Sequence, residues 1–229
     1  MSPSWFIPLI SAAAALAPAA QAAPPASVQI TYDISRNGTS IAEVVHRLEQ
    51  SNRSYAVTET WKGRGIFALR GSATRTSRGV VTPQGLRPLE YTDQRSGRDT
   101  ARATFDWTGK TLTLQYRDGP RTSELPPRPH DRLAFLFEFA FMPPKKSVEV
   151  VFDIADGRGL SHQVYRVGAR ERLRVPAGEF NALKMTRTKE DERADLWFAV
   201  DRDFLPVRIL ITGKDGVQID QAATSIVTP

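Results

Sequence analysis

Residues 28–48 read VQITYDISRNGTSIAEVVHRL, and this stretch decides the fold class. From Val28 to Ile34 every second residue is apolar, which is typical of a strand that buries one face. Asn37-Gly38 follows, and this dipeptide favours the two-residue type I′ turn of a β-hairpin. From Ala42 to Leu48 the alternation returns, with His46 on its apolar side. The stretch therefore predicts an antiparallel hairpin.

Comparable segments recur along the chain, among them residues 66–78, and they are separated by glycine-containing turns such as Asp118-Gly119 and Asp215-Gly216. About a dozen short strands at this spacing are typical of all-β sandwiches, rolls and barrels rather than of βαβ sheets. We expect residues 24–229 to form a single, mainly β domain, either an antiparallel β-roll or a half-open β-barrel.

Residues 131–142 read DRLAFLFEFAFM and differ from the alternating segments. Prolines bracket them, within residues 126–129 and at Pro143-Pro144, and Asp131 is a favourable N-cap. We therefore expect one main helix over residues 132–141. A strand is the alternative, because four phenylalanines alternate, namely Phe135, Phe137, Phe139 and Phe141.

As a helix, residues 133–142 are apolar around the whole circumference except at Glu138. Such a helix must be buried on every side or must meet something apolar. It either plugs the interior of the curved sheet or covers a lipophilic ligand. In the second case the expected ligand-binding residues are Phe135, Phe137, Phe139 and Phe141.

The N-terminal stretch combines an apolar segment with the small-x-small sequence Ala20-Gln21-Ala22. This is typical of a secretory signal peptide, here residues 1–22, with cleavage after Ala22 or Ala23. The apolar segment is too short to span the ~30 Å of a bilayer core, so we expect no transmembrane segment in the mature chain. The chain has no cysteine, which excludes disulfides, thiolate metal sites and a lipid-bearing cysteine. We expect a periplasmic protein.

The net charge of +6 comes from one part of the chain. Residues 62–102 contain nine cations, eight of them arginine, and three acids, whereas 22 cations balance 22 acids elsewhere. Arginine offers planar donors that suit phosphate and carboxylate groups. This segment either is a solvated face or binds an anionic envelope component, with Arg70, Arg75 and Arg78 as candidate residues. Nucleic acid would suit such a patch, but an exported protein would not meet it.

The sequence lacks the common motifs of catalysis and metal binding. His46, His130 and His162 have no local spacing, to one another or to a carboxylate, that would build a zinc site. The Gly-x-Ser-x-Gly elbow of serine hydrolases is missing. The acidic run Glu190-Asp191-Glu192 lacks the alternating ligands of a calcium loop. We expect no catalytic residue, no metal and no cofactor.

Several short pieces of the sequence carry a family resemblance. In chain order they are Tyr32-Asp-Ile34, Asp131-Arg-Leu133, Val175-Pro-Ala-Gly-Glu-Phe-Asn-Ala-Leu-Lys-Met185, Leu196-Trp-Phe198, Asp201 and Leu205-Pro-Val-Arg-Ile209. In this order and spacing they resemble the domain-of-unknown-function 3108 family (DUF3108) of bacterial exported proteins, over nearly the whole mature chain. The resemblance implies a β-rich envelope protein and favours a helix at 132–141. Comparable tail patterns occur in half-open barrels like those of lipoprotein carriers. The resemblance brings no activity and no catalytic residue.

We therefore expect a non-catalytic envelope protein that binds an amphiphilic or anionic component, a lipid or polysaccharide, in transport, assembly or maintenance. A membrane surface is a further candidate partner. One alternative is a hydrolase or lyase that acts on envelope polymers through carboxylates. Another is a protein–protein scaffold with exposed strand edges. A closed apolar cavity beside residues 133–142 would favour the binding protein, and an accessible pair of carboxylates would favour the enzyme.

Overall fold

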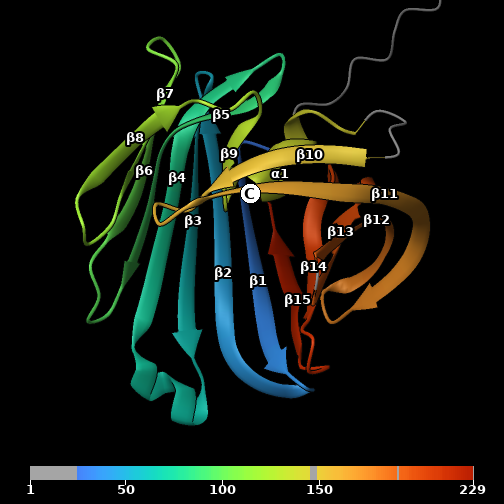
Figure 1. Ribbon diagram of the computed structural model, residues 1–229. Coiled ribbons are helices and arrows are strands. Elements are labelled where there is room, and N and C mark those ends of the chain that lie inside the picture. The colour runs from blue at the N-terminus through green and yellow to red at the C-terminus, as the bar shows by residue number, and fades with distance from the viewer. Residues whose placement is uncertain (1–24, 145–148, 190, 229) are drawn as a thin grey trace, which may run out of the picture.

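The computed structural model describes residues 25–144, 149–189 and 191–228. Their strands form one continuous, curved sheet of fifteen strands, which confirms the mainly β, half-open fold (Figure 1). The predicted signal peptide, residues 1–22, lies outside the described residues. None of the helices in the described ranges is long and apolar enough to cross a membrane.

The first half of the chain is a meander in which each strand pairs antiparallel with the next. Its strands are β1 (Ser27–Arg36), β2 (Thr39–Ser51), β3 (Ser54–Gly63), β4 (Ser72–Thr82), β5 (Gly85–Arg95), β6 (Ala101–Asp106), β7 (Thr111–Gln115) and β8 (Pro120–Glu124). A 3-10 helix, η1 (Gly65–Arg70), separates β3 from β4. The predicted strand over residues 66–78 is therefore wrong in its first part. Gly71 interrupts the extended backbone there with a φ of +78°.

The second half returns to the first strand and completes the sheet. Its elements are β9 (Pro129–Asp131), α1 (Ala134–Phe141), β10 (Glu149–Ala155), β11 (Leu160–Val175), β12 (Gly178–Lys189), β13 (Glu192–Ala199), η2 (Val200–Arg202), β14 (Leu205–Thr212) and β15 (Gln218–Val227). Because β15 pairs with β1, the strand order runs from β8 through β1 and β15 to β9. Strands β9 and β10 are parallel, and the other pairs are antiparallel.

The hairpin of β1 and β2 has the two-residue turn that the sequence predicted, and a β-bulge between Ile34 and Ser35 shifts the register of the rest of the pair by one residue. Arg36 lies opposite Thr39, and Asn37 and Gly38 have the positive φ angles of +49° and +81° that a type I′ turn requires. The apolar side faces inward, and it includes His46, which is fully buried with its ring 4.8 Å from that of Tyr32.

Helix α1 confirms a helix in the phenylalanine-rich segment but begins at Ala134, two residues later than predicted. Asp131 belongs to β9, where it lies opposite Ala155 of β10. Its carboxylate nevertheless accepts the backbone N–H groups of Leu133 at 2.8 Å and Ala134 at 2.9 Å. The short parallel pairing delays the helix start while the capping interaction survives. The predicted range 132–141 is thus wrong at its start and correct at its end.

The two halves of the sheet meet again without pairing strands. Figure 1 shows β10 and β11 crossing in front of β1–β4, with α1 behind them. At the turn between β10 and β11, Arg158 Nη1 lies 2.8 Å from Asp93 Oδ2 of β5, and its carbonyl accepts a 2.9 Å hydrogen bond from Arg121 of β8. These side-chain contacts hold the barrel nearly closed where a strand ladder is missing.

Gly157 lies at this contact and gives a test of it. A β-carbon there would stand 2.5 Å from the backbone N of Arg102, and the φ of Gly157 is +80°. We expect Gly157→Ala to lower the free energy of unfolding by on the order of 2–3 kcal/mol, from backbone strain plus the collision. Gly119→Ala is the matched control, because its φ is +87° with nothing within 4 Å. Equal losses in denaturant unfolding would mean that the close approach is unimportant.

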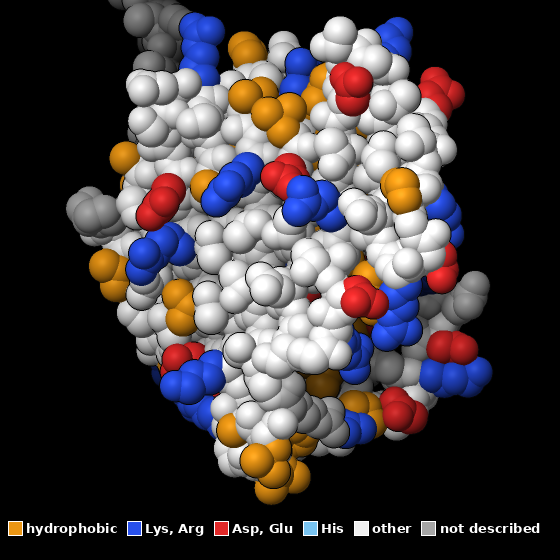
Figure 2. Space-filling model, turned by 90° about the vertical axis from the view of Figure 1, so that its left-hand side faces the viewer, with side chains coloured by type: hydrophobic (Ala, Val, Ile, Leu, Met, Phe, Trp, Pro, Cys, Tyr) orange, Lys and Arg blue, Asp and Glu red, His pale blue; other side chains and the backbone are white. Residues whose placement is uncertain are grey.

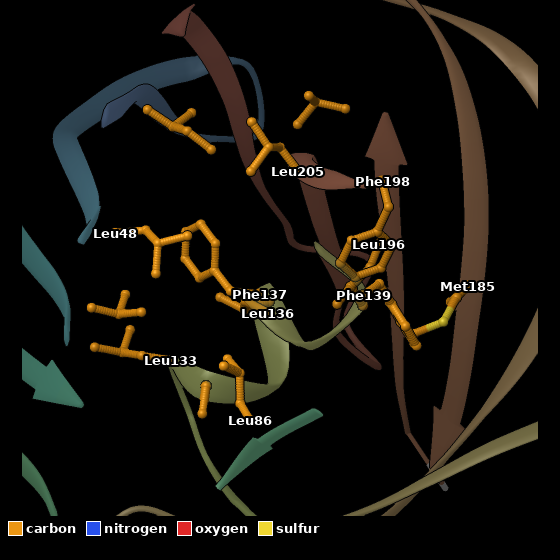
Figure 3. Close-up of a cluster of buried hydrophobic side chains, with 14 of the residues drawn as sticks. Leu48, Leu86, Leu133, Leu136, Phe137, Phe139, Met185, Leu196, Phe198 and Leu205 are labelled. Atoms are coloured by element: carbon orange, nitrogen blue, oxygen red, sulfur yellow. The ribbon is translucent and has the colours of Figure 1, made fainter. Parts of the chain in front are cut away.

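The core fills the space between α1 and both halves of the sheet. Figure 3 shows Phe137 directed toward Leu48 of β2, while Phe139 lies beside Phe198 of β13. The rings of Phe139 and Phe198 are 5.1 Å apart and meet edge to face. Helix α1 is therefore held in place by the core, and this fixes the position of its side chains that are not part of the core.

Candidate functional site

A cavity of about 590 Å³ lies on the concave side of the sheet, beside the start of α1. Strands from both halves contribute to it, from β1 to β4 and from β10 to β15. The apolar part of its wall includes the buried side chains of Val44, Leu133, Ile154, Ala194 and Leu196. This volume lies within the range of about 300–1,000 Å³ that is usual for small-molecule sites.

Helix α1 contributes only part of its surface to this cavity. Phe135 lines it together with Tyr165, with the two rings 6.2 Å apart. Phe137 and Phe139 are 0% and 2% exposed and pack into the core, and Phe141 is partly buried against it. Successive members of this set lie about 200° apart around a helix, so the structure separates the four phenylalanines that the sequence grouped. The helix is a core plug whose first turn is also a cavity wall.

Polar groups surround the more exposed part of the cavity. The side chain of Arg132 is 49% exposed, and its nearest acidic oxygen, on Asp156, is 4.0 Å away. Glu192 lies on the opposite side at the start of β13, where it pairs with Arg187 of β12. The cavity thus combines apolar walls with charged groups, an arrangement that suits an amphiphile.

Three residues that line the cavity each contain a buried nitrogen without a hydrogen-bond acceptor among the described residues. These nitrogens are Nε of Arg75, Nε of Arg187 and Nε2 of Gln221. Arg75 Nε does lie 3.4 Å from Asp93 Oδ2, which is close enough for an ion pair. A buried donor without an acceptor costs about 1–3 kcal/mol.

A ladder of ionisable side chains crosses the inner face of four neighbouring strands. His46, Glu59, Arg75 and Asp93 are direct cross-strand partners, one on each strand from β2 to β5. His46 Nε2 lies 2.9 Å from Glu59, whose other oxygen accepts a hydrogen bond from Arg75. Opposite charges on directly facing positions attract each other across a sheet. Glu59 and Arg75 also line the cavity, so the ladder forms one of its walls.

Burial and charge act in opposite directions on the carboxylates of this ladder. Burial alone would raise the pKa of Glu59, but its hydrogen bond to His46 and the charges of His46 and Arg75 lower the pKa to about 2. Burial also opposes ionisation of Asp93, but hydrogen bonds from Arg95 and Arg158 lower its pKa below the ordinary range. Both carboxylates are therefore ionised at neutral pH and hold the surrounding cations in place.

A second polar cluster fixes the start of α1. Asp131 is fully buried and accepts a 2.6 Å hydrogen bond from Ser77, whose hydroxyl also lies 3.1 Å from that of Tyr55. Burial raises the pKa of Asp131 to about 6, although these hydrogen bonds oppose the shift. Glu138, the one charged residue of α1, accepts the backbone N–H of Leu86 at 2.8 Å. Both acids tie the helix to β4 and β5.

The raised pKa of Asp131 predicts a pH dependence with a definite sign. Since the folded-state pKa of about 6 exceeds the ordinary value of 3.8, the folded state favours the protonated acid. Its contribution to stability is complete below about pH 4 and is lost as the pH rises through about 6. The stability difference between the parent and Asp131→Asn should therefore change by on the order of 3 kcal/mol over that interval. Urea unfolding at a series of pH values measures it, and a constant difference would contradict the assignment.

The three arginines predicted to bind anions do not form one patch. Arg75 points inward and belongs to the ladder, whereas Arg78, three positions further along β4, is exposed. Positions an odd number apart on a strand face opposite sides, which explains the separation. Arg70 is the last residue of η1, outside the sheet. The positive charge of the whole basic segment, residues 62–102, is partly neutralised by ion pairs such as that of Arg102 with Glu90.

Each histidine has a single carboxylate partner. His46 meets Glu59, His130 Nε2 lies 3.3 Å from Glu138, and His162 Nδ1 lies 2.8 Å from Asp153. No group of three or more histidines and acids in the part of the chain that the structure describes could hold a metal ion. The histidines instead belong to pairs that connect neighbouring elements.

Sequence reasoning missed the ladder, although a signal for it exists. Tyr55, Val57 and Trp61 alternate along residues 55–61 as one apolar side of a strand, and Glu59 occupies the remaining position on that side. A charged residue on an apolar side is a buried charge that needs a partner. The partners could not be named without the register of β2 to β5.

Comparisons with known proteins identify the family. None of the curated proteins matches the chain. Among solved structures, a predicted exported protein with a YmcC-like fold from Bacteroides fragilis is 11% identical, with a TM-score of 0.39 over 87% of this chain and 95% of that one. A predicted lipoprotein from Parabacteroides distasonis is 11% identical, with a TM-score of 0.34 over 89% and 97%. The family described as "Protein of unknown function (DUF3108)" matches residues 31–221, and the chain therefore belongs to the DUF3108 family.

Proposed function

We propose that this protein is a non-catalytic binding protein of the bacterial envelope whose cavity takes an amphiphile with an anionic or otherwise acceptor-rich head. One observation carries the proposal: a cavity of about 590 Å³ is lined both by apolar side chains and by the arginines Arg75, Arg132 and Arg187. Apolar walls suit a hydrocarbon body, and guanidinium groups suit carboxylate or phosphate oxygens. Such a protein would serve in the transport, assembly or maintenance of an envelope lipid or glycolipid.

The buried acids Glu59 and Asp131 do not suit general acid catalysis at the cavity. A general acid needs a pKa raised toward neutrality. Glu59 lines the cavity, and its pKa is instead lowered to about 2. Burial alone would raise this pKa, but the hydrogen bond to His46 and the cationic neighbours lower it by more. Asp131 has a raised pKa, but it is fully buried and holds the start of α1. Neither carboxylate combines access with a suitable pKa.

The proposed localisation in the bacterial envelope rests on residues 1–22, which are typical of a signal peptide. We expect the exported form to begin at Ala23 or Pro24. Mass spectrometry of protein recovered from the periplasm reads this directly, and an intact Met1 would contradict the signal peptide.

A cavity-filling substitution tests the proposal. Ile211 lines the cavity, and Ile211→Trp would occupy part of it. Val164 is 39% exposed and lies on β11 between two cavity-lining residues, so Val164→Trp adds the same ring outside the cavity. We expect saturable binding of a fluorescent long-chain fatty acid by the parent and by Val164→Trp, and at least about tenfold weaker binding by Ile211→Trp. Equal binding by all three proteins would place the ligand elsewhere, and no binding by the parent would refute the proposal.

A further inference from the structure

The turn η1 carries the most exposed large hydrophobic side chains of the described chain. Ile66 is 77% exposed and Leu69 is 90% exposed. Side chains three residues apart eclipse each other in a 3-10 helix, so these two form one ridge. Figure 2 shows hydrophobic side chains gathered at the lower tip of the molecule, where η1 lies in Figure 1.

The backbone around η1 holds this ridge in place. A β-carbon at Gly63 would collide with the carbonyl of Phe67, so glycine lets η1 fold tightly against the end of β3. Gly71 has a φ of +78°, and a β-carbon there would stand 2.5 Å from Cβ of Ser96 in the turn after β5. The ridge is thus packed at its base and exposed at its top.

Cations and a polar hollow lie next to the ridge. Lys62 and Arg98 are exposed and make no ion pair within the described residues. A hollow of about 670 Å³ begins at Ser72, two residues after η1. Its lining includes Arg95, Arg98 and Arg117, the acid Asp99 and uncharged polar side chains. Arg117 has only a 3.7 Å contact with the exposed Asp99. The tip therefore combines an apolar ridge with accessible donors for anionic groups.

We propose that η1 and this hollow dock the protein on an anionic lipid surface. The ridge of Ile66 and Leu69 enters the acyl boundary, while Lys62, Arg98 and Arg117 bind headgroup phosphates. Apolar burial and electrostatic attraction add in such interfacial sites. A ridge of two side chains is far smaller than the roughly 800 Å² per partner that a stable protein interface buries, which favours lipid over protein.

Docking at this tip would place the cavity beside the bilayer. The cavity-lining residues Ile34, Trp61 and Ile211 lie within the last residues of β1, β3 and β14, at the end of the sheet that carries η1. The lipid surface would then supply the ligand of the cavity. This connection between docking and ligand uptake rests on the proposed function, whereas docking itself does not.

A single fluorophore can report docking, because the chain has no cysteine. Leu69→Cys, carrying an environment-sensitive label, should shift to the blue with phosphatidylglycerol–phosphatidylethanolamine vesicles and not with phosphatidylcholine vesicles. The same label at Val227→Cys, also exposed at 53%, should not respond.

Vesicle co-sedimentation of the full mature chain gives the quantitative test. We expect Ile66→Ser with Leu69→Ser to bind anionic vesicles at least about tenfold more weakly, and Lys62→Gln with Arg98→Gln roughly 30-fold more weakly and with less salt dependence. Arg53→Gln with Lys110→Gln removes the same charge at the opposite end of the sheet and should change nothing.

Two results would overturn the inference: no binding of anionic vesicles by the parent, or equal binding by the ridge variant. A parent that forms ridge-dependent dimers without binding vesicles would also overturn it and assign the ridge to self-association. Ile211→Trp should bind vesicles like the parent while it loses fatty-acid uptake. A parent that binds vesicles but takes up no fatty acid would refute the proposed function and leave docking standing.

Discussion

Truncation of Phe137 to alanine should lower the free energy of unfolding by about 3–5 kcal/mol, the usual loss for an aromatic ring removed from a packed core. Phe137 is 0% exposed, and its ring centre lies 6.0 Å from that of His46. It also points toward Leu48 and away from Phe139, which meets Phe198 (Figure 3). Urea unfolding followed by circular dichroism measures the loss.

Phe135→Ala is the matched comparison on the same helix. Its ring packs 5.8 Å from that of Phe152 on one side and lines the cavity on another, so fewer contacts are lost on truncation. We expect a stability loss at least about 1 kcal/mol smaller than that of Phe137→Ala, together with weaker uptake of a fluorescent fatty acid. Equal stability losses with unchanged uptake would mean that α1 is a plug on every side and has no part in binding.

Removal of the Asp93 carboxylate should have an effect of similar size. The side chain of Asp93 is 0% exposed and contacts three guanidinium groups, those of Arg75, Arg95 and Arg158. Asp93→Ala leaves these cations without their shared partner, and breaking a buried ion pair in this way costs about 3–5 kcal/mol. The contact between β5 and the turn after β10 would open at the same time. Denaturant unfolding and hydrogen exchange of the β10–β11 turn report the two effects separately.

Glu90→Ala provides the control from the same strand. Glu90 pairs with Arg102 at 2.8 Å, but both side chains are well exposed, at 39% and 50%. Exposed pairs contribute less than about 1 kcal/mol because water screens them. A loss for Asp93→Ala no greater than that for Glu90→Ala would show that the ladder is not a stabilising feature of this fold.

Local patterns predicted the local structure well. The alternation of Val28 to Ile34, followed by Asn37-Gly38, specified the strands and the turn. The β-bulge between Ile34 and Ser35, which shifts the register of the rest of the pair by one residue, was not predicted. The first residue of α1 was harder to predict from the sequence. Asp131 has the chemistry of an N-cap, but its pairing with Ala155 in a three-residue parallel strand depends on residues 24 positions away. Nothing local to Asp131 could reveal that pairing.

The site could not be predicted because its parts come from distant strands. The cavity exists only because β15 pairs with β1 and brings residues such as Ile34 and Gln221 to the same space. Arg75 was one of three arginines that the sequence offered as anion-binding candidates, but its neighbours Glu59 and Asp93 follow from strand register rather than from sequence spacing. The sequence grouped four phenylalanines by residue type, whereas helix geometry places Phe135 and Phe139 on one side of α1 and Phe137 and Phe141 on another.

Native mass spectrometry of the protein purified from its own periplasm tests the central claim most directly. The cavity predicts a population of protein with one bound amphiphile, which solvent extraction releases and whose mass identifies its headgroup. The same preparation of Ile211→Trp should carry little or none, while Val164→Trp should carry as much as the parent. A parent that carries no amphiphile and does not acquire one from added lipid, or equal loading of all three proteins, would contradict the cavity as the binding site.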